Sequence, residues 1–235
     1  MSPRIDQNRN LLTNLILIFP LLIVYQLGVL LTYPMLNGAD FVSGLLFGQL
    51  RFTQPQYLFF VLLVTVGFLA TVVMLRRRQP FQTRIVVPIV LESTIYALTM
   101  GSLIVLVMTK VFGISPRLAA AVEQQGILAR VVMSLGAGVY EELVFRLGLL
   151  GGLFYVADRV FRWGKWPSLA LALLLSSLAF SAAHHVPPYG DPLQIDVFTF
   201  RALAGVFFGL LFWFRGLAVA VYTHALYDVY VLLIR

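Results

Sequence analysis

The sequence contains no cysteine and few charged residues. Without cysteine the chain can form no disulfide, no thiolate metal site and no cysteine nucleophile. Only 11% of the 235 residues are charged, whereas 60% are hydrophobic and the mean hydropathy is +0.90. This composition lies far outside the range of soluble globular domains. The lack of cysteine excludes thiol chemistry, and the low share of charged residues indicates an integral membrane protein.

Basic residues outnumber acidic residues by 17 to 10, which gives a formal net charge of +7. They occur in short clusters between apolar runs, where anionic lipid headgroups and membrane orientation account for them. We therefore expect membrane lipids as partners and no nucleic acid. The sequence favours no particular oligomeric state.

We expect seven apolar runs to span the membrane, and several of them exceed the roughly 18 apolar residues that cross a bilayer core of about 30 Å. They cover residues 11–33, 57–75, 85–108, 127 to about 156, 168–185, 198–214 and 217–234. The fourth run is long enough to be split at Gly148 or at Gly151 and Gly152. The sequence therefore predicts an all-α, polytopic membrane bundle of seven or eight transmembrane helices, in a single domain over residues 1–235.

The distribution of basic residues between the loops predicts the orientation of the chain. One side of the seven-span arrangement collects Arg4, Arg9, Arg76, Arg77, Arg78, Arg84, Arg159, Arg162, Lys165 and Arg215. The other side has Arg51, Lys110, Arg117, Arg201 and Arg235. Basic residues are enriched in cytoplasmic loops. We therefore expect a cytoplasmic N-terminus in the cell (inner) membrane.

Three charged side chains, Glu141, Glu142 and Arg146, interrupt the fourth apolar run. Positions four apart share one face of an α-helix, while neighbours diverge by about 100°. We therefore expect Glu142 to pair with Arg146, which lowers the free-energy cost of burying both, and Glu141 to have no obvious local partner. The triad alone is compatible with a helix staple, a polar transport pathway or catalysis.

All three histidines of the chain lie in apolar runs or at their ends. His184 and His185 end the fifth run, and His224 is followed four residues later by Asp228. With Glu141 these residues supply a general base, a polarising group and a water or metal site. Their joint occurrence favours chemistry over simple helix stapling. We interpret His185, which lies about 100° from His184 on a helix, as structural or as lining the rim of the site.

Three motifs follow one another in a recognisable order along the C-terminal half. They are EExxxR (Glu141, Glu142, Arg146), FxxxH (Phe180, His184) and HxxxD (His224, Asp228), with Gly205 and Gly209 in the helix between the last two. This order resembles the CPBP family, which comprises the CAAX-type prenyl proteases and the bacteriocin-processing or Abi proteins. The resemblance covers residues 127–234, and we expect the two glycines to allow close helix packing.

The resemblance implies an intramembrane endopeptidase that cleaves a membrane-associated protein or peptide. In such an enzyme Glu141 would be the base and His184 its partner in activating water. His224 and Asp228 would bind the scissile carbonyl or its oxyanion, and Glu142 with Arg146 would support the site. Residues 127–234 would then form the catalytic core, with residues 1–126 as accessory N-terminal spans.

Asp228 stands where the family usually has asparagine. An ionised aspartate cannot donate a hydrogen bond to an oxyanion, whereas asparagine can. Asp228 is therefore either protonated or used differently, for example as a partner of His224. It could also join Glu141, His184 and His224 as a ligand of a divalent metal such as zinc. The resemblance leaves a glutamate-type and a metal-dependent mechanism open.

The membrane depths expected for Glu141, His224 and His184 do not agree. At 1.5 Å per helical residue, Glu141 and His224 both lie roughly 20 Å below one membrane face. His184 ends its run and so falls close to that face. A site that uses water needs such side chains within about 3 to 5 Å of a common centre. We therefore expect the four residues to converge and the span boundaries to need correction.

Signatures of other intramembrane proteases, HExxH, GxGD and GxSG, are missing from the sequence. Two hypotheses without catalysis stay open. A transporter using the buried charges would show paired repeats with interrupted helices, and no internal repeat is visible. A catalytically silent binding or immunity protein of the same fold would lack a motif residue, and only Asp228 comes near that.

Overall fold

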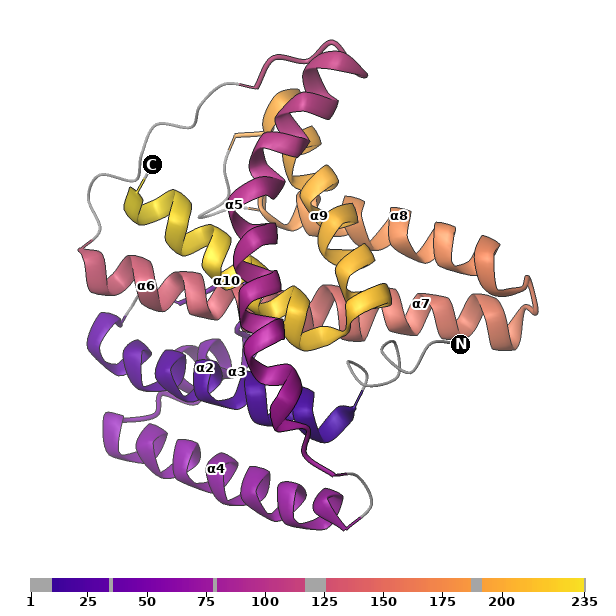
Figure 1. Ribbon diagram of the computed structural model, residues 1–235. Helices are drawn as coiled ribbons and strands as arrows, with labels where there is room; N and C mark the ends of the chain where they lie inside the picture. Colours follow the sequence, from indigo (N-terminus) through magenta and orange to yellow (C-terminus); the bar gives the residue numbers. More distant parts are fainter. Residues whose placement is uncertain (1–9, 34–35, 78–79, 117–125, 187–191, 235) are drawn as a thin grey trace.

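The computed structural model describes residues 10–33, 36–77, 80–116, 126–186 and 192–234, and every regular element in these ranges is helical (Figure 1). The N-terminal part contains α2 (Leu11–Thr32), α3 (Phe41–Gly44), η1 (Leu45–Gln49), α4 (Gln54–Arg76), η2 (Thr83–Ile85) and α5 (Val86–Lys110). The C-terminal part contains α6 (Ile127–Gly136), η3 (Ala137–Leu150), α7 (Gly151–Tyr155), η4 (Val156–Val160), α8 (Lys165–Ala183), α9 (Ile195–Arg215) and α10 (Leu217–Ile234). The all-α prediction is confirmed for this part of the chain.

The expected count of seven or eight membrane spans is not confirmed. Five helical stretches among the described residues are long and apolar enough to cross a membrane: α2, α4, α5 with η2, α8 and α9. The fourth expected span is divided among α6, η3, α7 and η4, because its helix type changes along the way. The seventh expected span corresponds to α10. The total number of spans therefore stays a prediction from the sequence.

The run from α6 to η4 stays helical throughout, and the split expected at the glycines is absent. Gly151 has φ −62° and ψ −43°, and its N–H bonds to the carbonyls of Arg146 and Gly148. A glycine permits a break but does not impose one when its backbone groups remain bonded. The change is instead to a π-helix of 14 residues, Ala137–Leu150. Such i→i+5 stretches are rare and are frequent at functional sites.

Small residues let the C-terminal helices approach one another closely. A Cβ placed on Gly138 of η3 would lie 2.6 Å from Cβ of Ala225 and 2.9 Å from the carbonyl oxygen of Val221, both in α10. A Cβ on Gly205 of α9 would lie 2.9 Å from Cα of Ser177 in α8. The prediction that Gly205 serves close packing is confirmed. The crossing at Gly138 places α10 beside the charged part of η3.

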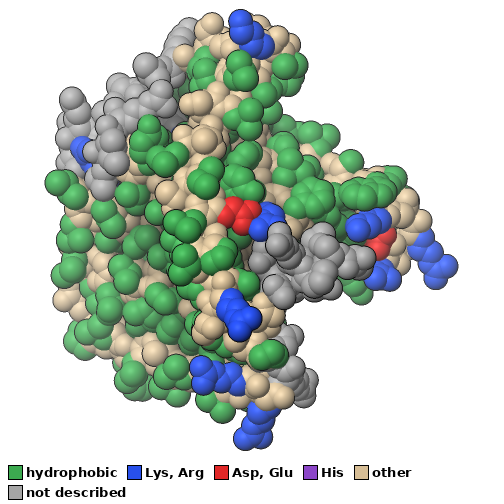
Figure 2. All heavy atoms as spheres, in the orientation of Figure 1, with side chains coloured by type: hydrophobic (Ala, Val, Ile, Leu, Met, Phe, Trp, Pro, Cys, Tyr) green, Lys and Arg blue, Asp and Glu red, His purple; other side chains and the backbone are tan. Residues whose placement is uncertain are grey.

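The N-terminal helices pack on this C-terminal group through α5, which contacts α10 and α9, and through α2, which contacts α6 and α10. The Val132 side chain lies so close to Gly28 that a Cβ there would meet it at 2.4 Å, and Tyr25 covers Gly136 in the same way. At the edge of the bundle, α4 buries only Tyr57 and Val61 (Figure 1). Apolar side chains cover most of the visible outer face, as expected for a surface in lipid (Figure 2).

The close crossing at Gly138 gives a testable prediction. Gly138→Ala should lower the free energy of unfolding by about 1 to 3 kcal/mol, because the added methyl group forces α10 away from η3. Gly152→Ala is a matched control in the same helical run, since a Cβ there meets nothing within 4 Å. It should leave stability unchanged or raise it by up to about 1 kcal/mol. Thermal unfolding in detergent measures both, and equal stability of the two variants would contradict the packing.

Candidate active site

The meeting of Glu141 and His184 follows from the hairpin formed by the long helical run and α8. The two elements are antiparallel neighbours joined by a turn at residues 161–164 (Figure 1). Glu141 lies 19 residues before Val160, the last helical residue, and His184 lies 19 residues after Lys165, the first of α8. The two residues are therefore equally far along the chain from the turn, and the antiparallel pairing brings them close together. The conflict in depth disappears because the run extends beyond the expected boundary, to Val160.

His224 reaches the same place from α10. The reversal between α9 and α10 occurs at Gly216, whose φ of 97° is a left-handed conformation that suits glycine. Phe208 lies eight residues before this glycine and His224 eight residues after it. Their rings stack with centroids 4.4 Å apart and planes 17° apart. The stacking on Phe208 and the close crossing at Gly138 together hold the imidazole beside the glutamates.

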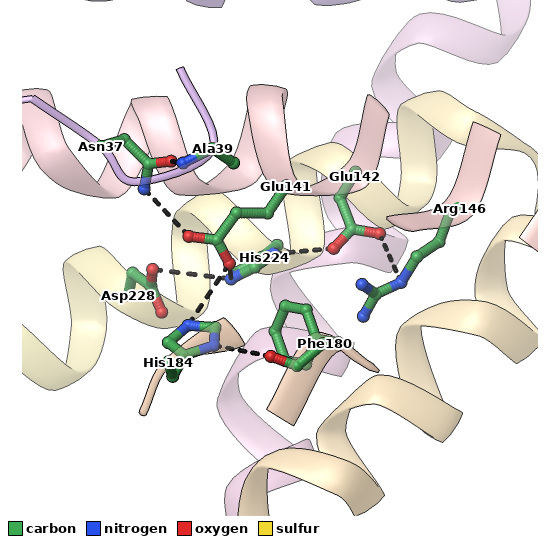
Figure 3. A network of polar contacts seen from close by, with 9 residues as sticks. All are labelled: Asn37, Ala39, Glu141, Glu142, Arg146, Phe180, His184, His224 and Asp228. Carbon is green, nitrogen blue, oxygen red and sulfur yellow. Dashed lines mark hydrogen bonds and ion pairs between the residues drawn. The ribbon is translucent and has the colours of Figure 1, made fainter. Parts of the chain in front are cut away.

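A chain of charged groups runs from Arg146 through Glu142 to His224 (Figure 3). Oε2 of Glu142 lies 3.1 Å from Nε of Arg146, and neither side chain is exposed to solvent. Oε1 of the same carboxylate lies 2.8 Å from Nδ1 of His224. The expected pairing of Glu142 with Arg146 is therefore present, and the carboxylate also fixes the histidine. Groups that orient a functional imidazole in this way commonly select its tautomer.

Two phenylalanines cover the guanidinium group of Arg146. Its Cζ atom lies 4.3 Å from the ring centroid of Phe180 and 5.3 Å from that of Phe208. Cations over aromatic faces are stabilised electrostatically, more so when water is excluded. Phe180, the first residue of the FxxxH motif, thereby supports the buried positive charge and also contacts the ring of His184, 4.9 Å away.

The carboxylate of Glu141 has one oxygen bound and one oxygen directed at the histidines. Oε1 accepts a hydrogen bond of 2.9 Å from Nδ2 of Asn37. Oε2 accepts none from the described residues and lies 3.5 Å from Nε2 of His184 and 3.9 Å from Nε2 of His224. Asp228 joins the group, because its Oδ2 lies 3.6 Å from Nε2 of His224. Figure 3 shows these side chains converging from η3, α8 and α10.

His184 and Asp228 form the more accessible side of this group. Their side chains are 28% and 26% exposed, against 9% for Glu141 and 5% for His224. Nδ1 of His184 lies 2.8 Å from the carbonyl oxygen of Phe180. A carbonyl oxygen can only accept, so Nδ1 carries the proton, and Nε2 of the neutral ring is left as an acceptor facing Glu141.

The structure brings together all six residues singled out in the sequence: Glu141, Glu142, Arg146, His184, His224 and Asp228. His185 takes no part in these contacts and stacks on Phe198, with centroids 5.9 Å apart. Asn37, which reaches Glu141 across 104 residues, was missed by sequence reasoning. An asparagine in a loop carries no motif and no helical periodicity that could have identified it.

The expected metal ligands do not form a metal-binding group in the structure. In the described ranges no three or more histidine, aspartate or glutamate side chains are placed to hold a metal ion. Oε1 of Glu141 and Nδ1 of His224 are bound to protein groups instead. Zinc binding by Glu141, His184, His224 and Asp228 stays a prediction from the sequence.

Comparison with known proteins agrees with the motif order. Residues 123–230 match the sequence model of the family described as type II CAAX prenyl endopeptidase Rce1-like. This segment contains the six residues above, whereas Asn37 lies outside it. No curated protein and no solved structure matches the chain.

The buried ion pair makes a prediction about stability. Arg146→Met should lower the free energy of unfolding by about 3 to 5 kcal/mol, because the Glu142 carboxylate loses its buried counter-charge. Arg159→Met is a matched control in the same helical run, where the arginine pairs with Asp158 and its side chain is 73% exposed. The control should cost at most about 0.5 kcal/mol. Denaturation in detergent would contradict the account if the two variants unfolded alike.

Proposed function

Because residues 123–230 belong to the family of Rce1-like type II CAAX prenyl endopeptidases, we propose that this membrane protein is an intramembrane endopeptidase. One observation carries the proposal. Oε2 of Glu141 faces Nε2 of both His184 and His224 within 4 Å, while the other oxygen of Glu141 and the other nitrogen of each histidine are bound to protein groups. The reactive atoms are therefore directed at one another and at a common centre.

Glu141 and His184 are the groups that activate water. A water beside Oε2 of Glu141 can direct one hydrogen to that oxygen and the other to Nε2 of His184, since both atoms are acceptors. In the reaction the water oxygen forms a bond to the scissile carbonyl carbon while its proton passes to Glu141. When the tetrahedral intermediate collapses, the C–N bond breaks and this proton is transferred to the leaving amine. The carboxylate is regenerated by the same cycle.

His224 stabilises the negative charge that develops on the carbonyl oxygen. With Nδ1–H donated to Glu142, a proton on Nε2 makes the ring a donor toward the oxyanion. The ionised carboxylate of Asp228 can only accept, and it lies 3.6 Å from the same nitrogen. We therefore assign to Asp228 the orientation of His224 rather than direct donation to the oxyanion. Glu142 and Arg146 support the ring from the other side.

The substrate is a membrane-associated protein or peptide. An apolar pocket of about 410 Å³ lies against the same helix as Glu141, with Val139, Leu143 and Leu147 in its lining. It extends between α2 and the start of α10 and suits an apolar group of a lipid-embedded substrate. Because the matched family is described as CAAX prenyl endopeptidases, a farnesylated CAAX peptide is the first probe to use.

The proposal also includes the orientation of the chain and the membrane in which it lies. Basic residues at the predicted loops favour a cytoplasmic N-terminus in the cell (inner) membrane. A transporter or a silent binding protein is less favoured, because the full set of motif residues converges and no paired repeat with interrupted helices is visible in the sequence. The finding that decides between these classes is peptide-bond cleavage.

The assignment of the base is tested by Glu141→Gln. The amide cannot accept the proton of water, so cleavage of a quenched farnesylated CAAX peptide should fall by at least about 10²-fold. Glu92→Gln is the matched control, because Glu92 pairs with Arg215 in α9, at 2.6 Å, and takes no part in the site. It should keep its activity within about twofold, and a Glu141→Gln protein as active as this control would refute the assignment.

The glutamate mechanism is tested by removing metals. Purified enzyme treated with a strong chelator should keep its rate of peptide cleavage, and its zinc content should fall well below one equivalent per chain. Loss of activity on chelation, restored by zinc but not by magnesium, would instead establish the metal-dependent mechanism. The ligand set would then be Glu141, His184, His224 and Asp228.

A further inference from the structure

Asn37 connects the candidate site to a region that the family match does not include. It lies in the loop between α2 and α3, at the start of the segment that leads into α3, and is 7% exposed. Nδ2 of its amide donates to Oε1 of Glu141 at 2.9 Å. The matched segment begins at residue 123. The carboxylate proposed as the base therefore depends on a contact from outside that segment.

The orientation of the Asn37 amide is set by its second partner. Its Oδ1 accepts a hydrogen bond of 2.8 Å from the backbone N–H of Ala39. That N–H can only donate, so the amide oxygen must face it and the NH₂ group must face Glu141. The backbone N–H of Asn37 also donates to the hydroxyl of Tyr25 at 3.2 Å. Together these contacts direct the NH₂ group of Asn37 toward the carboxylate of Glu141.

The loop that carries Asn37 is itself anchored on both sides. The backbone N–H of Asp40 bonds to the carbonyl of Asn37 at 3.0 Å, and the Asp40 carboxylate caps α3 by accepting from the N–H of Ser43 at 2.9 Å. The Ser43 hydroxyl is hydrogen-bonded to the hydroxyl of Tyr57 in α4 at 2.8 Å. Gln26 of α2 bonds to Tyr57 and also to Tyr140, the neighbour of Glu141. The loop is thereby tied to α2, α4 and η3.

We propose that Asn37 is a positioning residue for the base, an inference that rests on the proposed function. Its hydrogen bond holds one oxygen of Glu141 and leaves the other to face the histidines and the attacking water. Donation to an ionised carboxylate is stronger than a neutral hydrogen bond and fixes geometry more firmly. Small displacements of a catalytic group lower rates steeply, because reacting atoms must be aligned. The accessory N-terminal region therefore completes the active site.

The test compares two buried polar residues of the N-terminal helices and loops, Asn37 and Ser93, in the full-length chain, purified in detergent and assayed with the quenched farnesylated CAAX peptide. Asn37→Ala removes the donor, and Asn37→Asp keeps the size of the side chain but sets a second carboxylate against Glu141. Both should lower kcat by about 10- to 100-fold, with KM changed less than about twofold, and Asn37→Asp should be the slower. Because a misfolded fraction would also lower the apparent kcat without changing KM, the rates are compared per folded enzyme in preparations of equal monodispersity.

Ser93→Ala is the matched control. Ser93 of α5 also links an N-terminal helix to α10, since its hydroxyl donates to the carbonyl of Val219 at 3.3 Å, but it has no contact with Glu141 among the hydrogen bonds described above. This variant should melt at a lower temperature while keeping its kcat. In thermal unfolding, the effects of Asn37→Ala and Glu141→Gln should be non-additive, as for directly bonded residues.

Two results would overturn the inference in distinguishable ways. If Glu141→Gln is inactive while Asn37→Ala and Asn37→Asp keep the kcat of the unaltered enzyme, the proposed function stands and the role of Asn37 is wrong. If the Glu141→Gln protein cleaves the peptide normally, the proposed function fails, and the role of Asn37 fails with it.

Discussion

The buried chain of charges Arg146–Glu142–His224 is the interaction on which the rest of the site depends. A carboxylate and a guanidinium group without solvent exposure are costly to desolvate, and an ion pair offsets this cost only when its geometry is good. Here the carboxylate uses both oxygens, one toward Arg146 and one toward His224, and the guanidinium lies over the rings of Phe180 and Phe208. The pairing of Glu142 with Arg146 leaves Glu141, the residue before Glu142, to face the histidines.

The packing of the surrounding helices places the residues of the site around this chain of charges. Gly138 lets α10 approach η3 closely enough for His224 to reach Glu142, and the hairpin with α8 brings His184 level with Glu141. The wide turn of the π-helix carries both glutamates and the arginine, at the place where such helices often mark function. Asn37 then secures the oxygen of Glu141 that faces away from the histidines. Helices and loop together direct one carboxylate oxygen at the reaction centre.

Helical periodicity was sufficient to predict the contacts made within one helix and insufficient for those made between elements. The spacing of four residues correctly paired Glu142 with Arg146 and placed Asp228 beside His224. It could not show that Glu142 also holds His224, because that contact depends on the crossing angle at Gly138. The π-helix was missed because an apolar run has the same composition in either helix type. Asn37 was missed because its contact depends on the path of a loop.

The central claim is that Glu142 holds His224 by Nδ1, and nitrogen NMR tests it directly. The chain has only three histidines, so ¹⁵N-histidine labelling in detergent gives few signals, and single substitutions assign them. The account predicts a protonated, hydrogen-bonded Nδ1 on His224, whose resonance shifts on Glu142→Gln while the resonances of His185 stay in place. A neutral His224 protonated only on Nε2, or a resonance unaffected by Glu142→Gln, would contradict it.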